Sequence, residues 1–280
     1  MNFKTTTLRP LKFIDGIPVE GTSKGNHMTI AVLLKQVPDT TAKISVNGGR
    51  VDENAVSKWS FSPYDEYALE AALQLKESTG GEIVAITAGP ARCEKLLRDA
   101  AAVGADTLVH VSAENFNEFD STQVQNLLAA AVQKSSASLI FCGKQAADTN
   151  AGSTGPGVAE LIGASCVTLV TEVSSEGGGY TATRPSSSGH EKVAVSAPCV
   201  FAFDKGVSEM RRPNVRGIMM AKKKPIETWS VGDLGVDIGA NGVNIDSHSP
   251  PAEKPPGQKF EGAESVSTVV SKLRDEANVI

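Results

Sequence analysis

Runs of apolar, β-branched residues alternate with stretches of helical period along most of this chain of 280 residues. The first run, Thr29–Lys35, is continuous, as in a strand that is buried on both faces of a parallel sheet. The pattern predicts further strands at 82–88, 107–111 and 138–142, and helices at 62–77, 91–103 and 122–134. Strands and helices that alternate with short connections predict an α/β fold with a doubly wound, mostly parallel sheet.

The helix that begins near residue 62 carries clear boundary signals. Ser62 suits the N-cap, Pro63 the first helical position, and Asp65 and Glu66 complement the helix dipole in the first turn. Gly80 and Gly81 follow the last turn and are expected to end the helix.

The pattern changes after Gly163. Short strands separated by turns are expected at 166–174, 180–184, 191–196 and 199–204. They predict an antiparallel or mixed extension of the sheet. A short hairpin is expected earlier, around the turn sequence Asn47–Gly49.

Three parts follow from these patterns. Residues 1–27 have no sustained period and are interpreted as a flexible N-terminal extension. Residues 28–246 are expected to form the α/β nucleotide-binding domain. Residues 247–280 begin with the proline-rich sequence SPPAEKPPGQ and end in a short helix at about 263–276. Because this extended C-terminal segment has little core of its own, it is expected to be either a loose terminus or an arm that packs on something else.

Composition excludes several classes of function. The net charge of −5 argues against a nucleic-acid partner, which would require a basic face. Without a run of about 18 apolar residues or a signal-peptide core, we expect a soluble, unexported chain with no membrane insertion. The four cysteines form no CxxC pair, so we expect buried reduced thiols and no metal site.

Ligands of open α/β sheets bind at the carboxyl ends of the strands, beside helix N-termini. Three segments occupy such positions: 35–40, 88–90 and 143–154. The third is rich in small residues, and Ser153 and Thr154 stand where a new helix begins, so its free N–H groups could bind a phosphate. A plain strand-to-helix turn is the alternative. Neither GxxxxGK[ST] nor GxGxxG is present, and no GxSxG or HExxH motif indicates catalytic residues.

Four separated stretches together resemble the β-subunit family of electron transfer flavoproteins. They are VLLKQVPDTTAKI at 32–44, SPYDEYALEAALQLKE at 62–77, GKQAADTNAGSTGPGVAELIG at 143–163 and SEMRRPNVRGIMMAKKKPIE at 208–227. The segments 88–106 and 272–280 also fit, so the resemblance covers residues 28–280. The string RGIMMAKKKPI downstream of the GKQA loop is the most specific part.

The resemblance implies a Rossmann-like, adenine-nucleotide-binding fold in an αβ heterodimer. One FAD is held mainly by the α subunit at the subunit junction. AMP, or a second FAD in the electron-bifurcating branch, is held by the β subunit. The family carries electrons from acyl-CoA dehydrogenases to a membrane quinone oxidoreductase, the electron transfer flavoprotein quinone oxidoreductase, as in fatty acid oxidation. We therefore expect an electron carrier rather than an enzyme, either cytoplasmic in a bacterium or in the mitochondrial matrix of a eukaryote.

The resemblance also assigns residues to the cofactor-binding site by position. They are Leu33, Ser62, Pro63, Tyr64, Asp65, Ala88, Gly143, Lys144, Gln145, Ala146, Ala147, Asp148, Thr149, Asn150, Ala151, Gly152, Ser153 and Thr154. Thr40 and Tyr64 match positions at which family members place aromatic residues near the flavin ring. Tyr64 keeps the aromatic character, whereas Thr40 departs from it.

A partner-recognition loop is assigned in the same way to about Asp204–Lys224. Its residues are Glu209, Arg211, Val215, Arg216, Lys222, Lys223 and Lys224. Val215 stands where the family has an exposed leucine anchor, so the apolar side chain is smaller here.

Other interpretations stay open. Ser153-Thr154-Gly155 is closer to the QTG of AMP-binding members than to the DGDTAQVG of bifurcating members, which favours AMP over a second FAD. A stand-alone nucleotide-binding protein of the universal-stress type would share the sheet and the anion loop, without needing the proline-rich arm. A nucleotide-dependent ligase or hydrolase would need a pyrophosphate loop or a catalytic base, and neither is evident.

Overall fold

The computed structural model describes residues 28–113, 115–176, 178–206, 208–254 and 256–280. These residues form two compact units, one from 28–42 and 57–244 and the other from 43–56 and 245–280. The expected extension at 1–27 lies outside the described residues.

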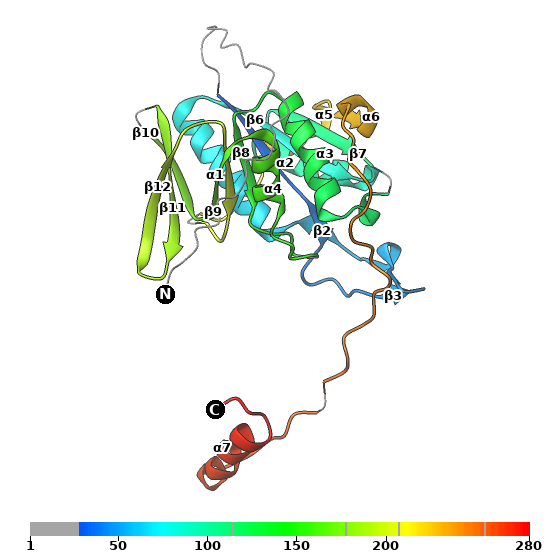
Figure 1. Cartoon of the computed structure of the whole chain (residues 1–280), viewed down its shortest axis with the longest axis vertical. Helices are drawn as coiled ribbons and strands as arrows, with labels where there is room; N and C mark the ends of the chain where they lie inside the picture. Colours follow the sequence, from blue (N-terminus) through cyan, green and yellow to red (C-terminus); the bar gives the residue numbers. More distant parts are fainter. Residues whose placement is uncertain (1–27, 114, 177, 207, 255) are drawn as a thin grey trace, which may run out of the picture. The chain divides into compact units, whose positions relative to one another are not determined.

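A seven-stranded sheet forms the centre of the larger unit, and all its neighbouring strands run parallel (Figure 1). Its order is β14-β7-β6-β1-β8-β13-β9. The strands are β1 Thr29–Leu33, β6 Glu82–Gly89, β7 Thr107–Ser112, β8 Leu139–Gly143, β9 Ser165–Val170, β13 Cys199–Phe203 and β14 Glu227–Ser230. This confirms the predicted α/β fold. The strand order reverses between β1 and β8, which makes that point the topological switch of the sheet.

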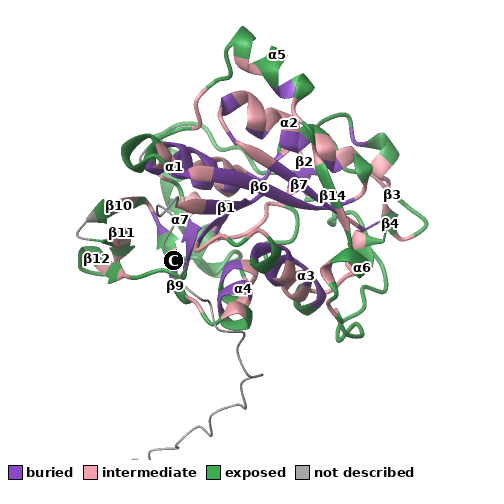
Figure 2. Cartoon of the chain, turned by 90° about the horizontal axis from the view of Figure 1, so that it is seen from above, coloured by how far each residue is buried: buried purple, intermediate pink, exposed green. Residues whose placement is uncertain are grey.

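Helices cover both faces of the sheet (Figure 2). They are α1 Pro63–Thr79, α2 Glu94–Val103, α3 Ser121–Lys134 and α4 Thr154–Ile162. Ile30 and Val32 of β1 pack in the hydrophobic cluster that contains residues of α1 and α2. Ala31 and Leu33 pack in the cluster that contains residues of α3 and α4. Because successive side chains of a strand face opposite sides and both faces are covered, the buried stretch Ile30–Leu33 is apolar throughout.

The boundaries of α1 follow the sequence signals. Ser62 occupies the N-cap position, Pro63 is the first helical residue, and Gly80 is the C-cap with a φ of 79°. Glycine adopts this left-handed conformation without the clash that a Cβ would cause. The Ser62 hydroxyl does not cap the helix, however. It bonds instead to the loop that follows β8.

The antiparallel strands of the second half form a separate sheet of three, β10 Glu172–Glu176, β11 Gly179–Ser186 and β12 Gly189–Val195. The single strand expected at 166–174 divides into β9, in the parallel sheet, and β10, in the antiparallel sheet. Leu169 has a φ of 59° near this division, and the pairing of β13 with β9 changes register beside it. Residues with a Cβ seldom adopt this conformation, so strand propensity gave no sign of the break.

Several short elements were not predicted. β2 (Gln36–Pro38) pairs antiparallel with β5 (Trp59–Phe61), and these two strands lie directly after β1 and before α1. β14 adds an edge strand parallel to β7. α6 (Val231–Leu234) follows it. Each is four residues or shorter, which is too short for a hydrophobic period to be recognised.

The structure of segment 204–224 differs from the sequence prediction. It was expected to be a loop throughout, but Val215–Lys223 forms a helix, α5. Asn214 is its N-cap, and the side chain accepts a hydrogen bond from the Gly217 N–H. Asparagine is among the preferred N-cap residues, so Asn214 was the available sign of a helix start.

The smaller unit contains a hairpin and the C-terminal segment. β3 (Val46–Asn47) and β4 (Arg50–Val51) pair around the predicted turn. Within this unit the Arg50 guanidinium donates to the Ile245 carbonyl at 2.6 Å, and the His248 N–H donates to the Gly49 carbonyl at 2.8 Å. The short helix expected near the C-terminus is α7, Val266–Asp275.

Candidate functional site

The carboxyl ends of three neighbouring strands, β6, β1 and β8, lie together at the switch point. Leu33, the last residue of β1, pairs with Ile86 of β6 and with Cys142 of β8. The segments that follow these strands are therefore brought to one edge of the sheet. They include the predicted positions Leu33, Ala88 and the start of the 143–154 loop. Leu33 and Ala88 are both buried at this edge.

Asp65 fastens two of these strand ends together. One carboxylate oxygen accepts the Lys35 N–H at 2.7 Å, and the other accepts the Gly143 N–H at 2.9 Å. Burial raises the pKa of Asp65 to about 7, against the lowering effect of the two N–H donors. A Cβ on Gly143 would come within 2.5 Å of the carboxylate. The close approach therefore requires glycine at the end of β8.

Ser62 ties the following loop to the beginning of α1. Its hydroxyl accepts the Ala147 N–H at 3.2 Å and donates to the Gln145 carbonyl at 3.4 Å. The same serine donates its backbone N–H to the Lys35 carbonyl. The start of α1 and the two loops after β1 and β8 are thus one hydrogen-bonded assembly, which we term the cradle: residues 33–35, 62–65, 88–89 and 143–154.

Two lysines of the cradle are paired with carboxylates. Lys35 forms an ion pair with Asp148 at 2.8 Å, and Lys144 forms one with Asp204 at 2.9 Å. The hydrogen bond with Asp204 raises the pKa of Lys144. The Lys144 ammonium also lies 4.7 Å from the centre of the Tyr64 ring. The charges of these lysines are balanced locally, which leaves the helix N-terminus as the remaining anion-attracting element.

The outer part of the cradle, 148–152, is exposed. Asn150 and Gly152 have φ values of 52° and 67°, and the Asn150 side chain accepts from the Gln145 amide at 3.0 Å. The segment leads into α4, whose N-cap Ser153 makes no side-chain cap bond. Its hydroxyl and carbonyl instead accept from Gln125 of α3, each at 3.1 Å. The first N–H groups of α4 are therefore left to an external acceptor.

Two residues that the sequence did not assign to the site are Lys35, which belongs to the cradle, and Gln125 of α3, which donates hydrogen bonds to Ser153 of the cradle. Lys35 follows β1 in one of the three segments singled out from the sequence, so its position was the available signal. Gln125 lies within α3 and reaches the site only through the packing of α3 beside α4. No local pattern could have identified it.

The residues that the sequence assigned to partner recognition fall into two groups. Val215, which is 75% exposed, Arg216, Lys222 and Lys223 lie on the surface of α5, and Glu209 is exposed ahead of it. Two other members are engaged within the chain: Lys224 donates to the Ala105 carbonyl at 2.6 Å, and Arg211 is bound by carboxylates of α1. The helix continues the exposed apolar surface through Ile218, Met219 and Met220.

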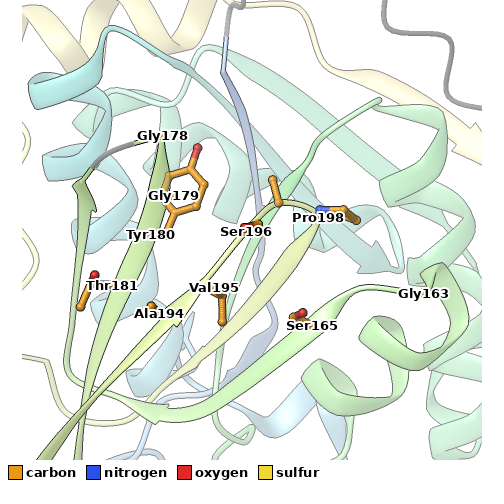
Figure 3. A pocket seen from close by; sticks show the side chains of 11 residues that line it. Gly163, Ser165, Gly178, Gly179, Tyr180, Thr181, Ala194, Val195, Ser196 and Pro198 are labelled. Carbon is orange, nitrogen blue, oxygen red and sulfur yellow. The ribbon is translucent and has the colours of Figure 1, made fainter.

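A separate hollow of about 710 Å³ lies at the opposite, amino ends of β9 and β13 (Figure 3). Small residues and Tyr180 line it, together with Gly163, the C-cap of α4. The C-terminal end of a helix repels anions, and no lysine or arginine is among the described lining residues. This hollow therefore lacks the positive charge and the helix N-terminus that anion binding requires.

Neither a metal cluster nor a membrane-spanning helix is found in the described part of the chain. No three His, Cys, Asp or Glu side chains are grouped there to hold a metal ion. None of its helices is long and apolar enough to cross a bilayer. Cys93, Cys142 and Cys199 are buried as expected, but Cys166 is exposed on β9, which corrects the expectation for that thiol.

Comparisons with known proteins give similar results over most of the chain: a family model and several curated relatives match it. The electron transfer flavoprotein domain matches residues 51–234. The electron transfer flavoprotein subunit beta of Bacillus subtilis is 36% identical and covers 90% of this chain and all of the relative. The subunit beta of Mus musculus is 34% identical over 89% of this chain and 97% of the relative. The caffeyl-CoA reductase-Etf complex subunit CarD of Acetobacterium woodii is 33% identical over 89% of this chain and 99% of the relative. With this similarity over nearly its whole length, the chain belongs to the electron transfer flavoprotein family, as a member of its beta subunits.

Proposed function

We propose that this chain assembles with an α subunit into a heterodimeric electron carrier that contains FAD. The carrier takes electrons from acyl-CoA dehydrogenases and related flavoprotein dehydrogenases and delivers them to a membrane quinone oxidoreductase. Family membership supports the electron-transfer role, and the names of the relatives support the place of a beta subunit. The chain acts as a carrier subunit and not as a catalyst, in the cytoplasm of a bacterium or the mitochondrial matrix of a eukaryote.

The observation that carries the proposal is the cradle at the switch point between β1 and β8. Its uncapped α4 N-terminus suits one phosphate, and Gly152 leaves room for the ligand to approach the backbone. Because Lys35 and Lys144 are already paired with carboxylates, little positive charge is left for a second phosphate. AMP therefore fits the site better than the diphosphate of a second FAD. AMP would be bound by residues 143–154, with Leu33, Ser62–Asp65 and Ala88 forming the rest of the site.

FAD, when bound mainly by the α subunit, supplies the redox chemistry of the carrier. In this chain, Tyr64 offers an aromatic ring at the start of α1, and we infer that it contacts the flavin ring. Thr40 has no aromatic side chain and is exposed, so its contribution would be smaller. The role of both residues is to position the flavin and exclude water.

Docking to a dehydrogenase is assigned to the exposed face of α5. Val215 provides an apolar side chain for a pocket on the partner, Arg216 adjoins it in the chain, and Lys222 and Lys223 add positive charge about two turns further along the helix. An apolar centre with a charged rim is typical of protein interfaces. The arm at 247–280 is proposed to pack on the α subunit, because α7 exposes Val266, Val270 and Leu273 along one face.

The test is co-expression with the α subunit, followed by mass identification of the nucleotides released from the purified complex. One FAD and one AMP per heterodimer are expected. Two FAD and no AMP would place the protein in the electron-bifurcating branch, an alternative that the similarity to the caffeyl-CoA reductase-Etf complex subunit keeps open. A chain that recruits no flavin-containing partner would contradict the proposal.

A further inference from the structure

Arg211 holds the segment between β13 and α5 against helix α1. Its guanidinium donates to both carboxylate oxygens of Glu70, at 3.0 Å from Nε and 2.8 Å from a terminal nitrogen. Its backbone N–H donates to Glu70 as well, at 3.0 Å. Glu77, two turns along the same helix, forms a second ion pair with the guanidinium. One arginine thus bonds two carboxylates of α1 through its side chain and its backbone.

The Glu70 carboxylate is unusual in its burial. The residue is 4% exposed, and its carboxylate also accepts from Gln74 at 2.9 Å. Although burial acts to raise the pKa of Glu70, the hydrogen bonds from Arg211 and Gln74 hold it below the ordinary value. A buried carboxylate with these bonds is costly to separate from its arginine, because the remaining charge would lose its partner. The contact is therefore expected to persist while the protein is folded.

Neighbouring residues support the same placement of the segment. Met210 packs against the hydrophobic cluster beneath α1. Gly206 approaches Tyr67 of α1 so closely that an added Cβ would lie 3.2 Å from the ring. Arg212, by contrast, is exposed to solvent. Two adjacent arginines therefore stand in opposite situations, one bound into the chain and one on its surface.

The start of α5 is fixed at its other side by α2. A Cβ on Gly217 would collide with the Ala102 carbonyl, so the two helices approach closely there. Arg98 of α2 donates to the carbonyls of Ala221 and Lys224 at 2.9 and 2.7 Å. Val215 is thus exposed on a helix that is held against α2 near both of its ends, while the segment leading into it is held by Arg211.

We propose that Arg211 is a positioning residue: with Glu70 and Glu77 it holds the segment before α5 in the conformation that presents Val215 to a partner, without contacting the partner itself. The inference rests on the docking function proposed for α5. A docking surface that is already in its bound conformation does not lose affinity to unproductive conformers. Releasing the segment should therefore weaken docking without changing electron transfer inside the docked complex.

The experiment uses the purified αβ heterodimer as the electron acceptor of a cognate acyl-CoA dehydrogenase. KM and kcat are measured for Arg211→Gln, Glu70→Gln and the matched control Arg212→Gln. If the docking-competent conformer falls to a tenth of the population, KM rises about tenfold for the first two variants while kcat stays unchanged. Arg212→Gln removes the same charge from the same segment, and its KM should change less than about twofold.

Glu70→Gln separates positioning from direct contact. Glu70 is buried and carries the opposite charge, so it can affect docking only through the segment that it holds. Equal effects of Arg211→Gln and Arg212→Gln, with no effect of Glu70→Gln, would show that Arg211 meets the partner directly and would overturn the inference. If Glu70→Gln impairs folding, Glu77→Gln at the exposed end of the cluster replaces it, and its KM is expected to rise about threefold. An unchanged KM for Glu77→Gln together with a raised KM for Arg212→Gln would also overturn the inference.

Val215→Asp distinguishes this inference from the function on which it rests. If Val215→Asp leaves KM unchanged, the docking role of α5 is wrong, whatever Arg211 does. If Val215→Asp raises KM but neither Arg211→Gln nor Glu70→Gln does, the docking role stands and the positioning role is wrong. Faster amide exchange across residues 208–214 in Arg211→Gln and Glu70→Gln, but not in Arg212→Gln, is expected alongside the change in KM.

Discussion

The cradle and the exposed surface of α5 are built in opposite ways. In the cradle, polar groups find partners within the chain: Asp65 accepts two backbone N–H groups, and Ser62 bonds to the loop after β8. On α5, Val215 and Met219 are 75% and 61% exposed. A nucleotide site can therefore be preformed in one subunit. The exposed apolar side chains of α5 instead support the proposal that another molecule covers this helix.

The difference teaches which properties belong to the chain alone and which to an assembly. Changes in the cradle should alter nucleotide content or pH dependence, whether or not a dehydrogenase is present. Changes in exposed apolar residues should alter association and leave the nucleotide in place.

Deletion of residues 247–280 should have the largest effect. The exposed face of α7 carries Val266, Val270 and Leu273, and burying three such side chains is worth on the order of 4 kcal/mol, or roughly a thousandfold in affinity. We expect that loss in the affinity for the α subunit, measured by concentration-dependent dissociation. Ser267→Asp, outside that apolar row, is the control. Unchanged affinity after the deletion would show that the arm is not part of the interface.

Gly152→Asp should reduce AMP retention by about a hundredfold, because a carboxylate beside a phosphate adds repulsion in a partly desolvated site. Gly152 has a φ of 67°, so part of any effect could come from the backbone. Gly152→Asn is the matched control, since asparagine tolerates this conformation and has no charge. AMP content is measured on the purified heterodimer. Stoichiometric AMP in the aspartate variant would remove the 143–154 loop from the phosphate site.

Asp65 predicts a pH dependence of stability that originates in the cradle. Its folded-state pKa of about 7 is above the ordinary aspartate value of 3.8. A raised carboxyl pKa contributes stability that is fully present below the unfolded pKa and is lost as the pH rises through the folded pKa. The free energy of unfolding should therefore fall by on the order of 2 kcal/mol between pH 5 and pH 8 on this account.

Asp65→Asn should remove that part of the pH dependence, whatever its effect on absolute stability. Denaturant unfolding of the heterodimer, followed at several pH values between 5 and 8, provides the comparison. An identical slope in the wild type and in Asp65→Asn would mean that other groups cause the dependence.

Val215→Ala should have the smallest effect, a loss of productive docking of about tenfold at most, since burying a valine is worth roughly 1.5 kcal/mol or somewhat more. Val215→Asp should be more damaging than Val215→Ala because it would bury an unpaired charge. The rate of flavin reduction by a dehydrogenase is compared with reduction by dithionite, which needs no docking. Val243, 69% exposed and outside α5, supplies Val243→Asp as the control. Equal enzymatic rates for Val215→Asp and wild type would exclude α5 as the docking surface.

The parallel sheet was predictable because its signal is local and strong. Ile30–Leu33 is apolar throughout, and the helix that begins at Pro63 is bounded by a proline and a glycine. The same reasoning brought the segments of the cradle to one edge of the sheet, since parallel strands end together. What it missed depends on distant contacts: Gln125 reaches Ser153 through packing of α3, and β14 is held by pairing with β7.

The segment before α5 shows most clearly what the sequence could not predict. The residues of the predicted recognition loop were chosen as exposed partner contacts, yet Arg211 turns inward to Glu70. Nothing in the order Arg211-Arg212 distinguishes the two arginines. The distinction requires the buried carboxylate of a helix that lies 141 residues earlier in the chain.

The close contact between Gly217 and Ala102 has a consequence for how this surface can change during evolution. The side of α5 that faces α2 tolerates almost no substitution, because any side chain at position 217 would push the helix away from α2. The opposite side, with Val215 and Met219, touches little else in the described chain and can be exchanged residue by residue. A lineage could thus acquire a new dehydrogenase partner by substitutions on one helix face while the nucleotide site and the sheet are inherited unaltered.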